Sequence, residues 1–138
     1  MTQAQILQAI RGRFRTLVET PQSLVVVQDN GPGPTAPTAK WCRLSVAPRS
    51  KTRLTVGPTP RWEIAGDVTV NLFVSAQQGE AVMLAIVDAI DAAFSGQRLT
   101  GPQISFGGVS PVGGPSLDGG WFARVVRWSY RAYAVGAA

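Results

Sequence analysis

Apolar residues recur at helical spacing near the start of the chain. Thr2 and Gln5 have the spacing of a capping box, in which a hydroxyl and an amide satisfy free backbone groups at a helix start. An apolar stripe follows and consists of Ile6, Ile10, Phe14 and Leu17. Pro21 cannot continue a helix, because it lacks the amide hydrogen. The pattern therefore predicts a helix that begins after Thr2 and ends at Pro21.

A second helical pattern runs from Gly79 to Phe94, and Gly96 supplies a stop signal. Its apolar face is formed by Met83, Ile86, Val87, Ile90 and Phe94. Its other side carries Glu80, Leu84, Asp88 and Asp91. Leu84 is thus an apolar residue among carboxylates.

Alternating apolar and polar residues predict strands, because successive side chains of a strand point to opposite faces. In the longest strand, apolar side chains face one way at Val68, Val70, Leu72 and Val74. A closing strand follows a turn at 118–120, and shorter strands are predicted at 24–27, 40–47 and 104–109. Each helix has a single apolar stripe, so both helices should cover the same layer. We therefore predict an α+β fold with two layers, a mainly antiparallel sheet with two helices packed on one face, in a single domain spanning 1–138.

Prolines interrupt two segments between strands, at 29–39 and at 48–60. Proline removes a backbone donor, so neither segment is expected to form a helix or a regular ladder. We predict that both are flexible and project from the domain. The second contains a possible short strand at 54–56, and either a mobile hairpin that orders on a partner or a solvated loop fits the pattern. The stretch 107–115 is Gly-rich and is also predicted to be a loop. It lacks the Gly-Lys-Ser/Thr ending of a phosphate-binding loop, so we expect no phosphate site there.

Composition argues against an enzyme. The chain has no histidine and one cysteine, Cys42, which removes histidine-based catalysis and nearly all zinc sites. Asp88 and Asp91 have no third ligand nearby, so we expect no metal and no other cofactor. The chain also lacks a membrane-spanning apolar run and the start of a signal peptide, which predicts a soluble protein working inside a cell or a particle.

The net charge of +5 is unevenly distributed along the chain. Residues 67–96 contain four acidic and no basic residues, whereas the rest of the chain is basic. A basic chain can bind nucleic acid, but its basic residues are scattered and form no known motif. Opposite charges on separate segments also suit a contact between identical subunits. We predict that the acidic helix side, Glu80, Leu84, Asp88 and Asp91, contacts basic residues of the next subunit. The expected basic residues are Arg49, Lys51, Arg53 and Arg61.

The order of these elements resembles a known family. The strand Trp41-Cys42-Arg43-Leu44-Ser45-Val46 is followed by a Gly-x-x-x-Val-x-Leu-Phe strand at 66–73. A Gly-Glu-Ala-led helix then ends in Asp-Ala-Ile-Asp-Ala-Ala-Phe, and the last strand opens with Asp-Gly-Gly-Trp-Phe. This arrangement resembles the tail-terminator, or tail-completion, proteins of long-tailed, lambda-like phages and of gene-transfer particles.

The resemblance implies a homohexameric ring on the head-proximal end of the tail tube. Such a ring stops polymerisation of the tube protein and offers a surface to the head-completion connector. It implies a place at the head–tail junction of the virion, assembly in the host cytoplasm, DNA only as passing cargo and no membrane partner.

Other functions fit the sequence less closely. Within the virion, the chain could be another neck or connector protein, or a tube-like tail subunit. From another class, it could be a basic nucleic-acid-binding module. The mass in solution separates these, since a ring-sized particle favours the terminator and DNA binding with a steep salt dependence favours the module.

Overall fold

The computed structural model of the chain describes residues 3–27, 40–75, 79–99, 103–118 and 120–135. Its helices are α1 (Gln3–Phe14), a π-helical turn (Arg15–Glu19), α2 (Thr20–Gln22) and α3 (Glu80–Phe94). Its strands are β1 (Val25–Val26), β2 (Lys40–Arg53), β3 (Arg61–Ser75), β4 (Arg98–Leu99), β5 (Ile104–Phe106), β6 (Ser110–Asp118) and β7 (Trp121–Val135). The predicted α+β class is therefore confirmed.

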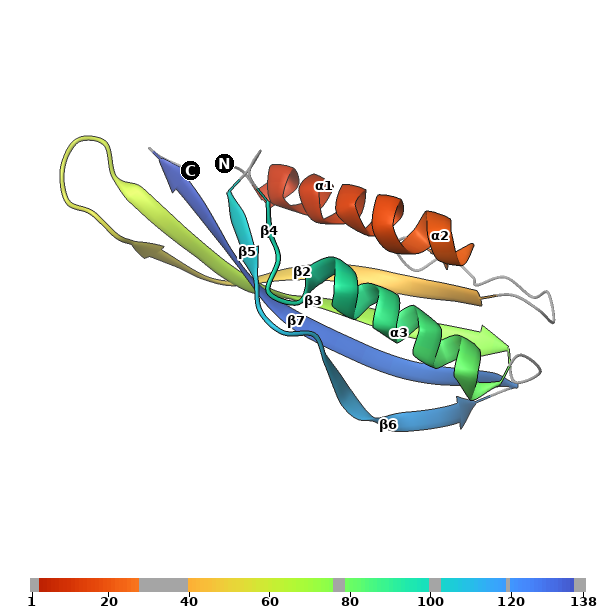
Figure 1. Ribbon diagram of the computed structural model, residues 1–138. Helices are drawn as coiled ribbons and strands as arrows, with labels where there is room; N and C mark the ends of the chain where they lie inside the picture. Colours follow the sequence, from red (N-terminus) through yellow and green to blue (C-terminus); the bar gives the residue numbers. More distant parts are fainter. Residues whose placement is uncertain (1–2, 28–39, 76–78, 100–102, 119, 136–138) are drawn as a thin grey trace.

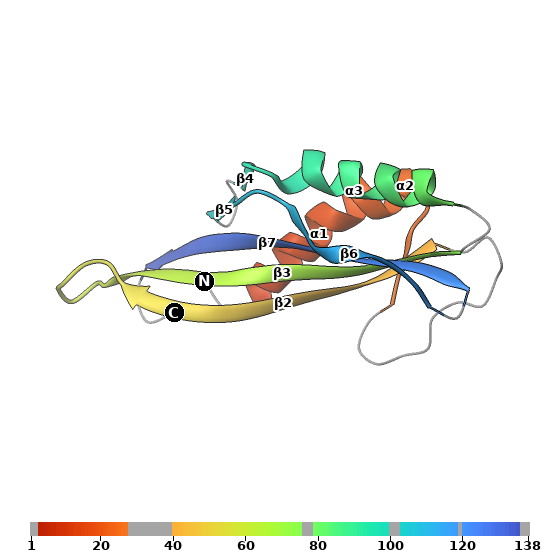
Figure 2. The ribbon, with the colours of Figure 1, turned by 90° about the horizontal axis from the view of Figure 1, so that it is seen from below.

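The strands form one mixed sheet in the order β1-β2-β3-β7-β5-β4, and β6 pairs with β7 off this path. β1 and β2 run parallel, whereas the other neighbouring strands run antiparallel. α1 and α3 lie on the same side of the sheet in Figure 2. We call the opposite side the open face, because no described helix covers it.

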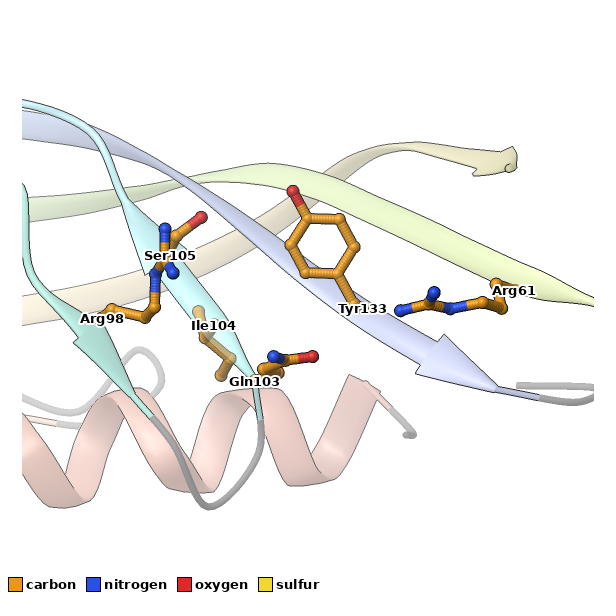
Figure 3. Close-up of a pocket in the computed structure, with 6 residues that line it drawn as sticks. All are labelled: Arg61, Arg98, Gln103, Ile104, Ser105 and Tyr133. Carbon is orange, nitrogen blue, oxygen red and sulfur yellow. The ribbon is translucent and has the colours of Figure 1, made fainter. Parts of the chain in front are cut away.

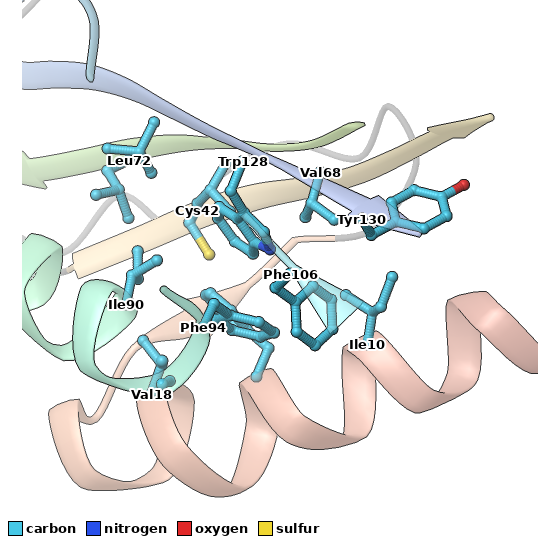
Figure 4. Close-up of a cluster of buried hydrophobic side chains, with 14 of the residues drawn as sticks. Ile10, Val18, Cys42, Val68, Leu72, Ile90, Phe94, Phe106, Trp128 and Tyr130 are labelled. Carbon is cyan, nitrogen blue, oxygen red and sulfur yellow. The ribbon is translucent and has the colours of Figure 1, made fainter. Parts of the chain in front are cut away.

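The core lies between the helices and the sheet (Figure 4). Even-numbered residues of β3 and β7 point into it, and register pairs Val68 with Trp128 and Val70 with Val126. Phe94 at the end of α3 lies edge-on to Phe106, with 5.1 Å between the ring centroids. The centroid of the Phe94 ring also lies 4.6 Å from that of Trp128. These contacts fix the orientation of α3, and with it the side that α3 exposes.

The first helical segment extends one residue beyond its predicted end. Pro21 lies in the first turn of α2, where a missing amide hydrogen costs little, and Ser23 ends the helix in a left-handed conformation with φ 51°. The capping residue Thr2 lies outside the described residues.

The prediction of an irregular segment at 48–60 is wrong for 48–53. These residues continue β2 and pair with β3 as far as Arg53 and Trp62, with a register shift between Pro48 and Ser50. Among the described residues, β1 pairs with β2 only at Trp41 and Cys42, so no described strand pairs with the outer edge of β2 at Pro48, where a missing donor is tolerated. Residues 54–60 form the connecting loop, without the possible strand at 54–56, and Figure 1 shows this hairpin extending beyond the helices. The other segment, 29–39, lies outside the described residues.

The Gly-rich loop prediction is also wrong in part. Residues 110–118 form β6, which pairs with β7 and has an irregularity between Val112 and Ser116. The neighbouring strand β7 is long and offers backbone hydrogen-bonding groups on both edges. Pairing with β7 therefore outweighs the weak strand propensity of the Gly-rich segment.

Candidate subunit interface

α3 presents a mixed apolar and acidic surface to solvent. Its inner side is buried at Met83, Ile86 and Ile90, so Glu80, Leu84 and Asp88 face outward. Leu84 is 43% exposed and has carboxylates on either side along the helix. The structure therefore brings these predicted residues together on one exposed side of α3.

Asp91 lies on the same side but also has a structural role. Ser95 donates a hydrogen bond from Oγ to Asp91 Oδ1 at 2.6 Å, and Ser95 Oγ accepts one from the Val109 amide at 2.8 Å. Asp91 thereby ties the end of α3 to the segment before β6. The sequence spacing alone did not reveal this role.

The four predicted basic residues do not form one patch. Arg49 and Arg61 lie on the open face, whereas Lys51 and Arg53 lie on the helix side. The strand register shows why. Ala47, one residue before Pro48, pairs with Asp67 on the open face, whereas Lys51 pairs with the buried Ile64 on the helix side. The shift between Pro48 and Ser50 inserts one residue, and a one-residue shift turns every later side chain to the other face.

Three of these basic side chains are already engaged within the chain. Arg49 Nη1 donates to both carboxylate oxygens of Asp67, at 3.0 and 2.9 Å. Lys51 Nζ lies 4.8 Å from the Trp62 ring centroid. Arg53 donates to the carbonyl oxygens of Thr55 and Gly57, both at 2.8 Å.

The open face is strongly basic. Arginines on it come from four strands and are Arg43, Arg49, Arg61, Arg98, Arg127 and Arg131. Its described carboxylates, Glu63 and Asp67, are each paired with an arginine, Glu63 with Arg131 at 3.8 Å and Asp67 with Arg49. The basic surface thus lies on the layer opposite the acidic side of α3. Sequence reasoning missed it, because it arises from strand register and not from clustering along the chain.

A cavity of about 270 Å³ lies at the end of the open face, at the base of the β2–β3 hairpin. Figure 3 shows the residues that line it, which are Arg61, Arg98, Gln103, Ile104, Ser105 and Tyr133. None of these six residues is acidic. Arg98 and Tyr133 were not predicted as site residues, since nothing in the sequence shows that β5 pairs with both β4 and β7.

The perturbed titratable groups are buried and carry no site chemistry. Burial raises the pKa of Cys42 to about 12, and the nearby Glu19 adds to the effect. Burial also raises the pKa of Tyr130, with a further increase from Asp67 that Arg49 opposes. Within the described ranges, no cluster of three His, Cys, Asp or Glu could hold a metal ion, and no helix is long and apolar enough to cross a membrane.

Comparison with known proteins identifies a family. A family model described as phage tail terminator protein matches residues 5–130. A solved structure, named only by a sequence identifier, matches with a TM-score of 0.70 over 96% of both chains at 18% identity, which shows a shared fold. No curated protein matches the chain.

Proposed function

The chain belongs to the phage tail terminator family and has a structural role in a phage tail, and we propose that it forms a closed ring on the tail tube. The ring, most simply a hexamer, occupies the head-proximal end of the tube. There it stops addition of tube protein and provides the surface that joins the head, through a head-completion connector. Family membership is the observation that carries this proposal.

The distribution of charge supports a head-to-tail contact between subunits. The acidic side of α3 and the basic open face lie on opposite layers of the domain, so they cannot meet within one subunit. A contact between two different surfaces closes into a ring when its rotation divides a full turn. Opposite charges on those surfaces favour this orientation over others.

The interface that we propose has Leu84 near its centre. Glu80, Asp88 and Asp91 surround it. The basic residues proposed for the opposing surface are Arg49, Lys51, Arg53 and Arg61. Exposed ion pairs contribute about 0–1 kcal/mol each, so the desolvated leucine should matter more than any one charge.

Assembly of the tube protein in the presence and absence of this chain tests the function. With the chain, tubes should stop at a defined length and join heads. Without it, tubes should grow to uncontrolled lengths and heads should remain unjoined. Tubes of normal length without the chain would contradict the proposal and would favour another neck or tube-like role.

The arginines of the open face also support a second candidate, a nucleic-acid-binding module. In that case DNA affinity would fall steeply as salt rises, because phosphate contacts release counterions. In the terminator role, DNA passes through the ring as cargo and needs no tight binding. A monomer that binds DNA tightly at physiological salt would support the module.

A further inference from the structure

Two arginines that line the same cavity have no ion-pair partner among the residues that the structure describes. On the open face, Arg49 pairs with Asp67 and Arg131 pairs with Glu63. Arg61 and Arg98 make no ion pair and no side-chain hydrogen bond with any described residue, yet both line the 270 Å³ cavity. Arg127 is also unpaired in the described part of the chain, but it does not line that cavity.

The cavity has the donors that a carboxylate requires. Register places Arg98 opposite Ser105, and Arg61 lies two residues before Glu63, which pairs with Tyr133. Figure 3 shows Arg61 and Arg98 at opposite sides of the cavity, with Tyr133 between them. A guanidinium offers a planar fork of donors that matches a carboxylate, and the hydroxyls and the Gln103 amide add further donors. The neighbouring carboxylate of Glu63 is already paired with Arg131.

Among the acidic side chains that the structure describes, two carboxylates also lack a partner. Glu19 pairs with Arg15, Glu63 with Arg131 and Asp67 with Arg49, while Asp91 accepts from Ser95. Among the carboxylates whose side chains the structure describes, Glu80 and Asp88 remain without a partner, and both are exposed on α3. Glu80 lies in the first turn, where the helix dipole already stabilises a negative charge. Asp88 lies in the middle of the helix and has no such compensation.

We propose that the cavity between Arg61 and Arg98 receives the Asp88 carboxylate from α3 of a second copy of this chain. This inference rests on the proposed ring. Arg61 remains a basic partner of the acidic side of α3, and Arg98 takes the place of Arg49, Lys51 and Arg53. The two halves of the contact lie on opposite layers, so each subunit presents Asp88 to one neighbour and the cavity to the other. Leu84, one turn from Asp88, enters the same contact.

Charge reversal on each side provides the test. Arg98→Glu and Asp88→Arg alter exposed residues, so both variants should fold and melt like the wild type. Each alone should weaken ring formation at least tenfold in sedimentation velocity, or in cosedimentation with tail tubes if rings form only there. Arg127→Glu, on the same face but outside the cavity, is the matched control and should assemble like the wild type.

Mixing the two variants gives the decisive result. In a ring that alternates Arg98→Glu and Asp88→Arg subunits, half of the contacts join Asp88 to an unchanged cavity. In the other half the introduced arginine meets the introduced glutamate, so the mixture should assemble clearly better than either variant alone. If both single variants assemble normally, or if the mixture fails to recover, this inference is wrong while the ring stands. If the wild-type chain forms no ring in solution or on tubes, the proposed function fails and this inference fails with it.

Discussion

At the residue scale, Gly66 is a position with no room for a side chain. It lies in β3 between β2 and β7, and a Cβ added there would collide with the Ala47 carbonyl oxygen and with the Tyr130 hydroxyl. One of these groups is backbone and the other belongs to a buried ring, so neither moves easily.

We therefore expect Gly66→Ala to lower the free energy of unfolding by about 1–3 kcal/mol, which is the usual cost of overpacking. Gly12→Ala is the matched control, because a Cβ at that helical position meets nothing within 4 Å. Alanine favours helix over glycine by up to about 1 kcal/mol, so the control should be slightly more stable than the wild type. Urea unfolding of the three proteins measures both effects, and a Gly66→Ala protein of unchanged stability would show that the strands can separate there.

Cys42 gives a pH-dependent prediction. Its ordinary pKa is near 9 and burial raises it to about 12 in the folded state. Below pH 9 both states keep the thiol proton, so this contribution to stability is complete. Between pH 9 and about 12 the unfolded state loses the proton first, which favours unfolding by up to about 1.4 kcal/mol per pH unit.

The comparison with Cys42→Ala isolates that effect, since other groups titrate in both proteins. The wild type should lose stability faster than Cys42→Ala as pH rises from 8 to 11. Parallel stability curves over this range would mean that the thiol ionises in the folded protein.

At the element scale, the β2–β3 hairpin differs most from its sequence-based description. Its outer part pairs regularly, and its loop is held by hydrogen bonds. The Leu54 amide donates to the Arg61 carbonyl oxygen at 2.7 Å, and the Arg61 amide donates to Thr55 Oγ1 at 2.9 Å. Val56, 98% exposed, is therefore presented on an ordered turn.

Removal of the Arg53 side chain should loosen this turn and leave the domain stable. Arg53→Ala loses the bonds to Thr55 and Gly57, so amide exchange at Leu54 and Arg61 should become faster while the melting temperature changes by no more than a few degrees. Thr52→Ala, the preceding exposed residue, should leave exchange unchanged. Equal exchange in both variants would show that the strand pairing alone orders the turn.

Most of the elements could be predicted from apolar periodicity, because the buried residues of α1, α3 and β3 recur at the expected spacing. The stripe of the first helix was wrong at Leu17, which is 41% exposed, whereas Val18 is buried. The π-helical turn at Arg15–Glu19 explains the difference, because it changes the spacing of the buried side after Phe14. The exposed side of α3 followed from the same periodicity. The sequence could not predict that Arg49 lies on the open face while Lys51 and Arg53 lie on the helix side. That difference depends on the one extra residue that β2 has between Pro48 and Ser50. Arg98 was missed for a similar reason, because its place on the same cavity as Arg61 depends on the order of strands in the sheet.

At the scale of the whole molecule, the two layers carry opposite charge. Three exposed carboxylates lie on α3, and six arginines lie on the open face, where Arg49 and Arg131 are the ones that pair with Asp67 and Glu63. A monomer needs no such separation, whereas a ring of identical subunits can use it to orient each contact.

Leu84→Asp tests the importance of the apolar centre of that contact. The leucine is 43% exposed, so the variant should fold normally, yet a carboxylate buried at the interface would remain unpaired. We expect a larger loss of ring assembly than for the double variant Asp88→Lys with Asp91→Lys, whose defect should depend on salt. Mass photometry over a salt series measures both, and unchanged ring mass in the two variants would exclude this face of α3 from the contact.

The central claim is that this protein ends the tail tube at its head-proximal side. Gold labelling of a tagged chain in complete particles, viewed by electron microscopy, tests it most directly. The account predicts label at a single position on each particle, at the junction of head and tail. Label along the length of the tube, or at the distal tip, would contradict it.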